Sequence, residues 1–309
     1  MSEAQRPAFR PVILPFIVFT LVWGSTWIVI RGQLGDVAPQ WSVTYRFIIA
    51  AVAMTLVALA KGHSLDIGRR GLAAAAFLGF TQFCVNFNAV YLAERHITSG
   101  VVATVFALLL IPATLLGWAF LGQRPTSRFL WSSLVAVAGI VLLFVHELQQ
   151  HPADSRHIAV GIALTLAGML GAAIANVVQA RPEVRHYPLF GLLAWSMAAG
   201  AAIDAVIAFA LAGPPTIDLR PSYWAGLLYL ALAASVLTFS LYYPVVRKIG
   251  PAKAAYSSVL VPIIAMGFST WLEDYRWTPL TIAGAVLALG GMVGALSRNR
   301  SVVPAPDAA

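Results

Sequence analysis

Two ionisable side chains, Arg46 and Asp204, stand inside long apolar stretches of the 309-residue sequence. Because a charge near the bilayer centre costs about 2.5–3.5 kcal/mol on insertion scales, each needs an explanation. Arg46 could bind a substrate carboxylate through a bidentate pair, or its guanidinium could extend to the outer interface or donate to neighbouring carbonyl groups. Asp204 could bind and release a coupling proton, or it could remain protonated and hydrogen-bonded to another helix.

Uncharged polar and aromatic residues supply further candidates, because at about 100° per residue they can be assigned to helix faces. Asn88 and Tyr91 share one face of their helix. Gln82 and Asn86 share the opposite face, so the two pairs cannot line the same cavity. We expect a substrate site built from Trp23, Thr26, Arg46, Asn88, Tyr91, Asn176, Gln179, Thr238, Tyr242, Tyr256 and Ser257. Each of these residues could instead serve hydrogen bonding or aromatic packing between helices.

The composition assigns the chain to the membrane. Hydrophobic residues make up 60% of it and charged residues 10%, whereas soluble domains have roughly 45–50% apolar and 25% charged residues. The single cysteine, Cys84, excludes an intrachain disulfide framework and a multi-cysteine metal centre. The net charge of +8 is spread between the apolar stretches without a dense basic cluster, which argues against nucleic acid as a partner. Membrane lipids and a small-molecule substrate are the expected partners.

The apolar stretches predict an all-α integral membrane protein, since a helix of about 20 mainly apolar residues crosses the hydrocarbon core. Short charged or Gly- and Pro-containing breaks divide the sequence into ten such segments. We expect ten transmembrane helices at residues 11–31, 40–60, 71–92, 97–121, 128–146, 158–180, 187–211, 222–245, 250–272 and 278–297.

Lys and Arg residues give these helices a direction across the membrane. Most of the 20 basic residues fall in loops on one side of the predicted membrane, and cytoplasmic loops carry such an excess. Both termini are therefore expected in the cytoplasm, with residues 1–10 as an N-terminal segment and residues 298–309 as a disordered tail. Residues 147–157 are expected to form an external linker between two halves.

The chain contains an internal repeat. When it is aligned with itself, the third to fifth predicted helices match the eighth to tenth without a gap. Identities include Phe87 with Phe239, Tyr91 with Tyr243, and Gly139 with Gly291. Because five crossings are an odd number, the second copy enters the membrane from the opposite side, so residues 11–146 and 158–297 are inverted repeats. Inverted repeats are typical of secondary transporters, which bind substrate near the midplane between them.

Several short motifs resemble the EamA-like members of the drug/metabolite transporter superfamily. They are Trp23-Gly24-Ser25-Thr26, Arg46-Phe47, the stretch from Phe87 to Gly139 with its Leu121-Gly122-Gln123 ending, and the matching block through Pro262 and Gly291. The resemblance implies a bacterial inner-membrane protein that transports amino acids or related metabolites, most often outward. It also implies a cavity lined by the first four helices of each repeat. Such proteins often end the fourth helix of each repeat with Gly-Glu, where this chain has Gly122-Gln123 and Glu273-Asp274.

The function predicted is therefore a secondary transporter that works by alternating access. The sequence has no Walker A motif, so ATP is not expected to drive transport directly, and no cofactor is predicted. An integral membrane enzyme acting on a lipid-linked substrate is the alternative, but the predicted helices contain no G-x-S-x-G, H-E-x-x-H or paired-carboxylate motif, so we do not expect an enzyme. A channel-like facilitator is a further alternative.

The linker residues His146, Glu147, His151, Asp154 and His157 match no established zinc spacing, so no metal site is predicted.

Overall fold

The structure is a computed structural model, and it describes residues 10–122, 124–150, 154–249 and 257–296. Over these ranges every regular element is a helix and no strand occurs, which confirms the all-α prediction. Large apolar side chains cover the outside of the bundle: Leu56 is 62% exposed, Val206 70% and Leu211 72%. In a helical protein with so apolar a surface, these side chains face lipid.

The first half of the chain follows the predicted segments closely. Its elements are α1 (Arg10–Gln33), α2 (Pro39–Ala60), α3 (Gly68–Leu78), the π-helix η2 (Gly79–Val85), α4 (Asn86–Ala93), α5 (Ser99–Phe106), the 3-10 turn η3 (Ala107–Leu109), α6 (Leu110–Leu121) and α7 (Ser127–Gln150). α3, η2 and α4 form one continuous helix, as do α5, η3 and α6.

The second half repeats this order. Its elements are α8 (Ser155–Ala180), the short α9 (Pro182–Arg185), α10 (Leu189–Ala212), α11 (Pro221–Leu228), the π-helix η5 (Tyr229–Leu237), α12 (Thr238–Ile249), α14 (Ser257–Leu272) and α15 (Pro279–Leu296). The two π-helical segments, η2 and η5, therefore interrupt corresponding helices of the two halves.

Eight of the described helices are long and apolar enough to span a membrane. Two shorter apolar helices, Leu260–Leu272 and Pro279–Ala295, occupy the positions of the ninth and tenth predicted segments. The ninth predicted segment begins at residue 250, and its residues 250–256 lie outside the described part of the chain.

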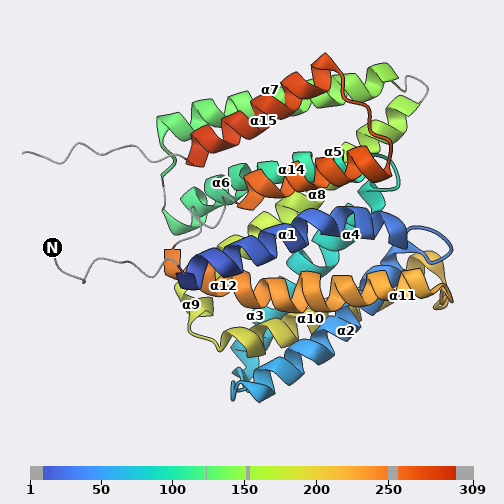
Figure 1. The fold of residues 1–309 in the computed structure, drawn as a ribbon. Helices are drawn as coiled ribbons and strands as arrows, with labels where there is room; N and C mark the ends of the chain where they lie inside the picture. The colour runs from blue at the N-terminus through green and yellow to red at the C-terminus, as the bar shows by residue number, and fades with distance from the viewer. Residues whose placement is uncertain (1–9, 123, 151–153, 250–256, 297–309) are drawn as a thin grey trace, which may run out of the picture.

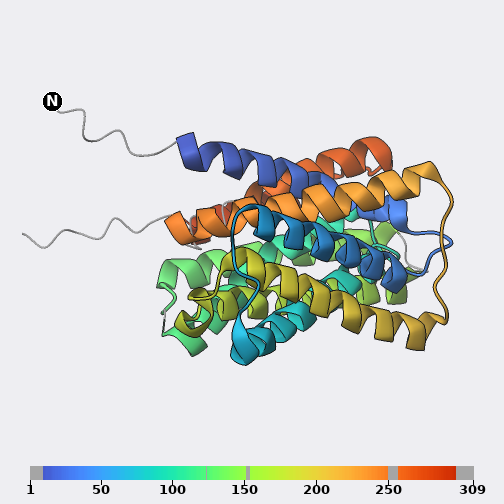
Figure 2. The same cartoon turned by 90° about the horizontal axis from the view of Figure 1, so that it is seen from below.

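The helices form three groups that are visible in Figure 1. α7 and α15 pack closely against each other at one edge, α2 and α10 pack together at the other edge, and the remaining long helices lie between them. The described chain begins in α1 and ends in α15 on the same side of the molecule (Figure 1). Figure 2 shows the bundle after a quarter turn, with the helices still running in roughly parallel and antiparallel directions.

Repeat-related glycines let α7 and α15 approach closely. A Cβ on Gly139 would lie 2.3 Å from the backbone nitrogen of Ala288, and one on Gly291 would lie 2.4 Å from that of Ala136. Small residues at helix crossings allow such close backbone packing within a membrane. The identity of Gly139 and Gly291 in the repeat therefore has a packing explanation.

Candidate functional site

A cavity of about 600 Å³ lies within the central group of helices. Its walls come from both halves of the chain: α1, α2, η2, α4, α5, η3, α6 and α7 from the first, and α8, α9, α12, α14 and α15 from the second. Small-molecule sites have volumes of about 300–1,000 Å³ and combine apolar walls with a few polar groups. The cavity has the size of a metabolite site.

The cavity is open at one end and closed at the other. Buried residues such as Arg46, Gln82 and Asn86 line its deep part, whereas the exposed residues Arg124 and Arg185 line the mouth. Arg124 follows the end of α6 and Arg185 ends α9. The basic mouth lies at the end of the bundle for which the Lys and Arg distribution predicts a cytoplasmic location.

Arg46, in α2, is 1% exposed and does not extend to the outer interface. Its Nε donates to Ser235 Oγ at 3.1 Å, and the Ser235 hydroxyl in turn donates to the Leu230 carbonyl of η5 at 2.9 Å. The guanidinium carbon lies 4.3 Å from the centre of the Phe87 ring and 5.3 Å from that of Phe47. Cation–π attraction of this kind contributes about 0.5–2 kcal/mol. Neutral groups therefore hold the cation in place.

The Arg46 guanidinium has no acidic counter-ion within the described ranges. None of the ion pairs that the described residues form includes it. Its Nη1 is buried and makes no hydrogen bond of acceptable geometry with a described residue, although the Tyr91 hydroxyl lies near enough to interact with the guanidinium. A buried cation that lacks an anion is costly.

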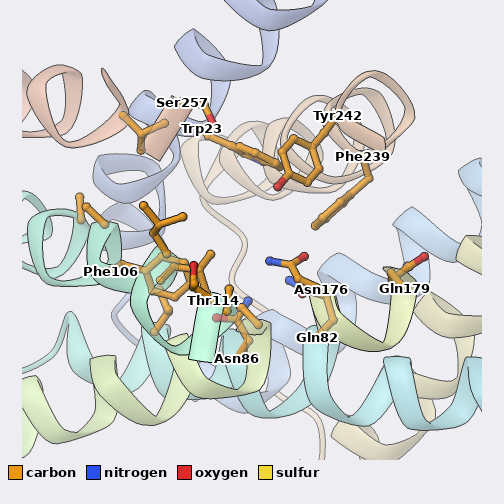
Figure 3. A pocket seen from close by; sticks show the side chains of 18 of the residues that line it. Trp23, Gln82, Asn86, Phe106, Thr114, Asn176, Gln179, Phe239, Tyr242 and Ser257 are labelled. Carbon is orange, nitrogen blue, oxygen red and sulfur yellow. The ribbon is translucent and has the colours of Figure 1, made fainter. Parts of the chain in front are cut away.

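Aromatic rings form the wall opposite the amide side chains (Figure 3). Trp23 lies 4.9 Å from Tyr242 and 5.8 Å from Phe239 between ring centres, and its indole nitrogen donates to the Ala234 carbonyl at 3.3 Å. Across the space from these rings, Figure 3 shows the side chains of Gln82 and Asn176. The cavity thus has an aromatic wall and an amide wall.

The structure brings seven of the predicted site residues to the cavity. They are Trp23, Thr26, Arg46, Asn176, Gln179, Tyr242 and Ser257. Tyr256 lies outside the described residues.

Asn88, Tyr91 and Thr238 are not among the described residues that line the cavity. The Thr238 hydroxyl donates to the Ala234 carbonyl of its own helix at 2.6 Å, and Tyr91 is fully buried. Asn88 donates through Nδ2 to Asp204 Oδ1 at 2.6 Å and to the Cys84 carbonyl at 3.0 Å. The face with Asn88 is turned toward α10 because a buried carboxyl group needs a hydrogen-bond donor.

The sequence-based choice of residues left out several members of the cavity wall. They are Gln82, Asn86, Phe87, Phe106, Phe239 and the mouth residues Arg124 and Arg185. The internal repeat carried a signal for two of them, since Phe87 and Phe239 are aligned identities and both line the cavity. No signal in the sequence distinguished the face with Gln82 and Asn86, because the pairing of Asn88 with Asp204 joins two helices that are distant in the chain.

Asp204 lies in α10 and is completely buried behind the cavity wall. In addition to the bond from Asn88, its carboxyl group interacts with the Cys84 thiol. Asp204 does not line the cavity itself. Because Asn88 is in α4 and Cys84 in η2, any change at this carboxyl acts on the helix that carries Gln82 and Asn86.

An ion-pair network closes the end opposite the mouth. Arg31, in the last turn of α1, lies 3.6 Å from Glu273 between Nε and Oε1, and it also donates to the Glu94 carbonyl. The Glu273 carboxylate accepts hydrogen bonds from the backbone nitrogen of Ser99 at 3.2 Å and from its hydroxyl at 2.6 Å. Together these contacts join the ends of α1 and α4, the start of α5 and the residue after α14.

The Glu94 side chain adds a titratable group to this closed end. It is completely buried, and burial together with the neighbouring Glu273 raises its pKa well above the usual value of 4.5, against a smaller lowering by Arg31. Among the residues that the structure describes, no group of three or more His, Cys, Asp or Glu side chains could hold a metal ion.

The fold and the cavity define the class of this chain, a multi-pass membrane protein with a solute-sized cavity between its two halves. A model of the EamA-like transporter family matches residues 10–145 and 159–297. The chain belongs to this family, so the resemblance read from the Trp23 and Arg46 motifs is confirmed.

Relatives over most of the chain carry transporter names. The chain is 23% identical over 282 residues to "Uncharacterized transporter YoaV" of Bacillus subtilis, with 91% of this chain and 95% of that protein covered. It is 28% identical to "Uncharacterized inner membrane transporter YedA" of Escherichia coli K12, with 85% and 83% covered. It is 24% identical to the "Probable amino-acid metabolite efflux pump" of the same strain, with 89% and 91% covered. The family and these names are those of transporters rather than enzymes.

A solved structure titled "Crystal structure of protein" is similar in fold. Its TM-score is 0.67 at 19% identity, and the match covers 91% of this chain and 95% of that one. At this identity the likeness concerns the arrangement of helices alone.

Proposed function

We propose that this protein is a secondary transporter of the bacterial inner membrane that exports amino acids or related small metabolites. It would have ten transmembrane helices in two inverted repeats, residues 11–146 and 158–297, with both termini in the cytoplasm. The observation that carries the proposal is Arg46, a buried cation on a cavity wall without an acidic partner among the described residues. The name of one relative, an efflux pump for amino-acid metabolites, supports the substrate class.

A carboxylate is the substrate group that Arg46 would bind. Its Nε is already engaged with Ser235, while Nη1 is buried and makes no hydrogen bond of acceptable geometry with a described residue. A guanidinium forms short charge-assisted bonds with carboxylates, so a small shift of this side chain would let it bind one. The rings of Phe47 and Phe87 restrict where the guanidinium can point. The remaining predicted contacts on the wall, Asn176, Gln179 and Tyr242, would orient the rest of the molecule.

Alternating access is supported by the unequal ends of the cavity. The mouth at Arg124 and Arg185 would be the cytoplasmic entrance, and the Arg31–Glu273 network would be the external closure. In the opposite state these contacts would separate and the mouth would close. Repeats of opposite orientation allow such an exchange, because each can adopt the conformation of the other.

Asp204 would bind the coupling proton. Its carboxyl group is buried, and it can exchange an accepted hydrogen bond from Asn88 for a donated one when it is protonated. Since Asn88 belongs to α4, protonation would be transmitted to the amide wall of the cavity through this helix. The coupling is thus indirect, because Asp204 does not touch the cavity space.

Counterflow in proteoliposomes tests the proposal. Vesicles are preloaded with a mixed pool of amino acids and their deaminated derivatives, and uptake of each labelled compound is followed with and without a pH gradient. We expect saturable exchange that is lost in Arg46→Gln. It should be kept in Arg69→Gln, which removes an exposed arginine that does not line the cavity. Linear, non-saturable flux would indicate a channel, and no flux in folded protein would contradict the proposal.

A further inference from the structure

We infer that the cavity selects organic monocarboxylates with an apolar or aromatic body and no ammonium group, in preference to the zwitterionic amino acids. This inference rests on the proposed transport function and narrows its substrate class. It follows from the charges on the cavity wall, from the groups that already surround Arg46, and from the nature of the remaining surface.

The side chains on the wall that carry a charge at neutral pH are all basic within the described ranges. Arg46 lines the deep part and Arg124 and Arg185 line the mouth, and no Asp or Glu is among the lining residues that the structure describes. The nearby stretches outside the described part, residue 123 and residues 250–256, contain one lysine and no acidic residue in their sequence. The wall therefore favours anions along its whole length.

Three acids that are buried or nearly buried lie close to the cavity but outside its wall. Asp204 lies behind the wall, where Asn88 and Cys84 interact with its carboxyl group. Glu273 is bound by Ser99 and Arg31 at the closed end. Glu94 lies at the same end, where its backbone carbonyl accepts from Arg31 and its carboxyl oxygens are buried without a hydrogen-bond partner among the described residues. None of these three acids lines the cavity, so none can neutralise a substrate ammonium group there.

The neutral groups of the wall are poor substitutes for a carboxylate. An α-ammonium group held next to a bound carboxylate would also lie close to the Arg46 guanidinium, and like charges repel each other. The ring nearest to Arg46, Phe87, already has the guanidinium over its face. Asn86 Oδ1 is a buried acceptor without a partner among described residues, but it carries only a partial charge. An ammonium group would lose its hydration without an adequate replacement.

The rest of the wall suits an apolar body. Trp23, Phe239 and Tyr242 pack edge to face or tilted against one another and form a continuous aromatic surface. Ile30, Val90 and Phe106 extend the apolar surface on the other sides. Across from the rings, the amides of Gln82 and Asn176 can bond a hydroxyl or keto oxygen, and Figure 3 shows them facing the same space.

Three compounds that differ only in their charged groups test this inference. 3-Phenylpropanoate has a ring and a carboxylate, L-phenylalanine adds an ammonium group, and phenethylamine has the ring and the ammonium group alone. Equilibrium binding to the purified full-length protein at neutral pH is measured by calorimetry. We expect 3-phenylpropanoate to bind at least about tenfold more tightly than L-phenylalanine, and phenethylamine to show no binding. Arg46→Gln should abolish binding of 3-phenylpropanoate.

A gain-of-function variant provides an independent check. Asn176→Asp would place a carboxylate on the amide wall, and it should raise the affinity for L-phenylalanine while lowering that for 3-phenylpropanoate. Gln179→Glu, one helical turn nearer the mouth, is the matched acidic control and should change the ratio less. A thermal unfolding midpoint near that of the unmodified protein establishes that each variant is folded.

The outcomes separate this inference from the proposed function. Equal or tighter binding of L-phenylalanine would overturn the preference while leaving an amino-acid transporter in place. Failure of folded protein to bind either acid would also overturn it, and the counterflow experiment with the mixed pool would then decide independently whether the protein is a transporter. A preference that survives in Arg46→Gln would show that the charge at Arg46 does not cause it.

Discussion

Asp204 and Asn88 show, at the scale of single residues, how a polar group in a membrane helix depends on one neighbour. The Asn88 amide donates to the Asp204 carboxyl group at 2.6 Å, and Asp204 is completely buried. Leaving a buried polar group without its partner costs about 1–3 kcal/mol, whereas replacing both partners by apolar groups can be nearly neutral. The two side chains should therefore behave as a pair.

Asn88→Leu is expected to destabilise the protein by about 1–3 kcal/mol, because it removes the donor and leaves the carboxyl group buried. Adding Asp204→Leu in the same chain should restore part of the loss. Thermal unfolding of the two single variants and the double variant in detergent measures this coupling. If the effects of the two substitutions simply add, the pair does not interact energetically and the proposed link between Asp204 and α4 fails.

Asp204→Asn tests the coupling role of the same residue. The amide cannot gain or lose a proton in the relevant range, so we expect exchange in counterflow to persist and the response to an imposed pH gradient to disappear. Ser196→Ala, a buried change in the same α10 helix, should retain the gradient response. An Asp204→Asn variant that still accumulates substrate when a gradient is imposed would exclude this carboxyl as the proton site.

At the scale of elements, α7 and α15 depend on two glycines related by the repeat. The nearest backbone atoms would lie 2.4 Å from a Cβ at Gly291, whereas the adjacent Gly290 has nothing within 4 Å. Gly291→Ala should therefore push the two helices apart and destabilise the protein by about 1–3 kcal/mol. Gly290→Ala should be neutral or slightly stabilising, since alanine favours the helix.

Thermal unfolding of these two neighbouring glycine variants distinguishes packing from a general effect of alanine. Equal unfolding midpoints for Gly290→Ala and Gly291→Ala would contradict the close α7–α15 crossing. Gly139 makes the corresponding close approach from α7. Gly139→Ala should therefore lower the unfolding midpoint about as much as Gly291→Ala does.

Helix positions could be predicted from the sequence because they depend on the length of apolar stretches. The predicted segment 40–60, for example, corresponds to α2 at Pro39–Ala60, and segment 158–180 to α8 at Ser155–Ala180. The face that each helix turns to the cavity could not be predicted in the same way. It depends on rotation about the helix axis, which contacts between distant residues determine.

The third helix shows this difference most clearly. The π-helical segment η2 and the contact between Asn88 and Asp204 turn the face with Gln82 and Asn86 to the cavity. The sequence showed that this helix has two polar faces, but it did not show that Asn88 on one of them pairs with Asp204 in α10. The position of Arg46 at the cavity could be predicted from the sequence alone. A charged residue within an apolar membrane helix almost always faces the interior of the helix bundle.

At the scale of the whole molecule, we expect Glu94 to make the stability of the closed end depend on pH. Burial raises its pKa, with a further increase from Glu273. A group with a higher pKa in the folded state contributes stability at low pH and loses that contribution as the pH rises through the folded-state value. We therefore expect the unfolding midpoint to fall as the pH rises through the raised pKa.

Glu94→Gln keeps the neutral form at every pH and should flatten this dependence. Measuring the unfolding midpoint as a function of pH for the unmodified protein and for Glu94→Gln tests the expectation. Glu183→Gln serves as the control. Glu183 is exposed, and a backbone hydrogen bond to its carboxylate, together with Arg181, lowers its pKa rather than raising it. An unchanged slope in Glu94→Gln would assign the pH dependence to another group.

Alternating access requires that one cavity is reached from the two sides of the membrane in turn. A single cysteine at Thr114, which lines the cavity, can report this when the native Cys84 is replaced by alanine. Leu219→Cys, at an 88% exposed position on the predicted external side, is the control for access from outside.

Labelling of Thr114→Cys by a membrane-impermeant maleimide, applied from each side of oriented vesicles, is the most direct measurement. We predict rapid labelling from the cytoplasmic side, slower labelling from outside that increases during substrate exchange, and protection by saturating substrate. Equal and simultaneous access from both sides would identify a channel. Access from the cytoplasmic side alone, unchanged while exchange proceeds, would contradict transport through this cavity.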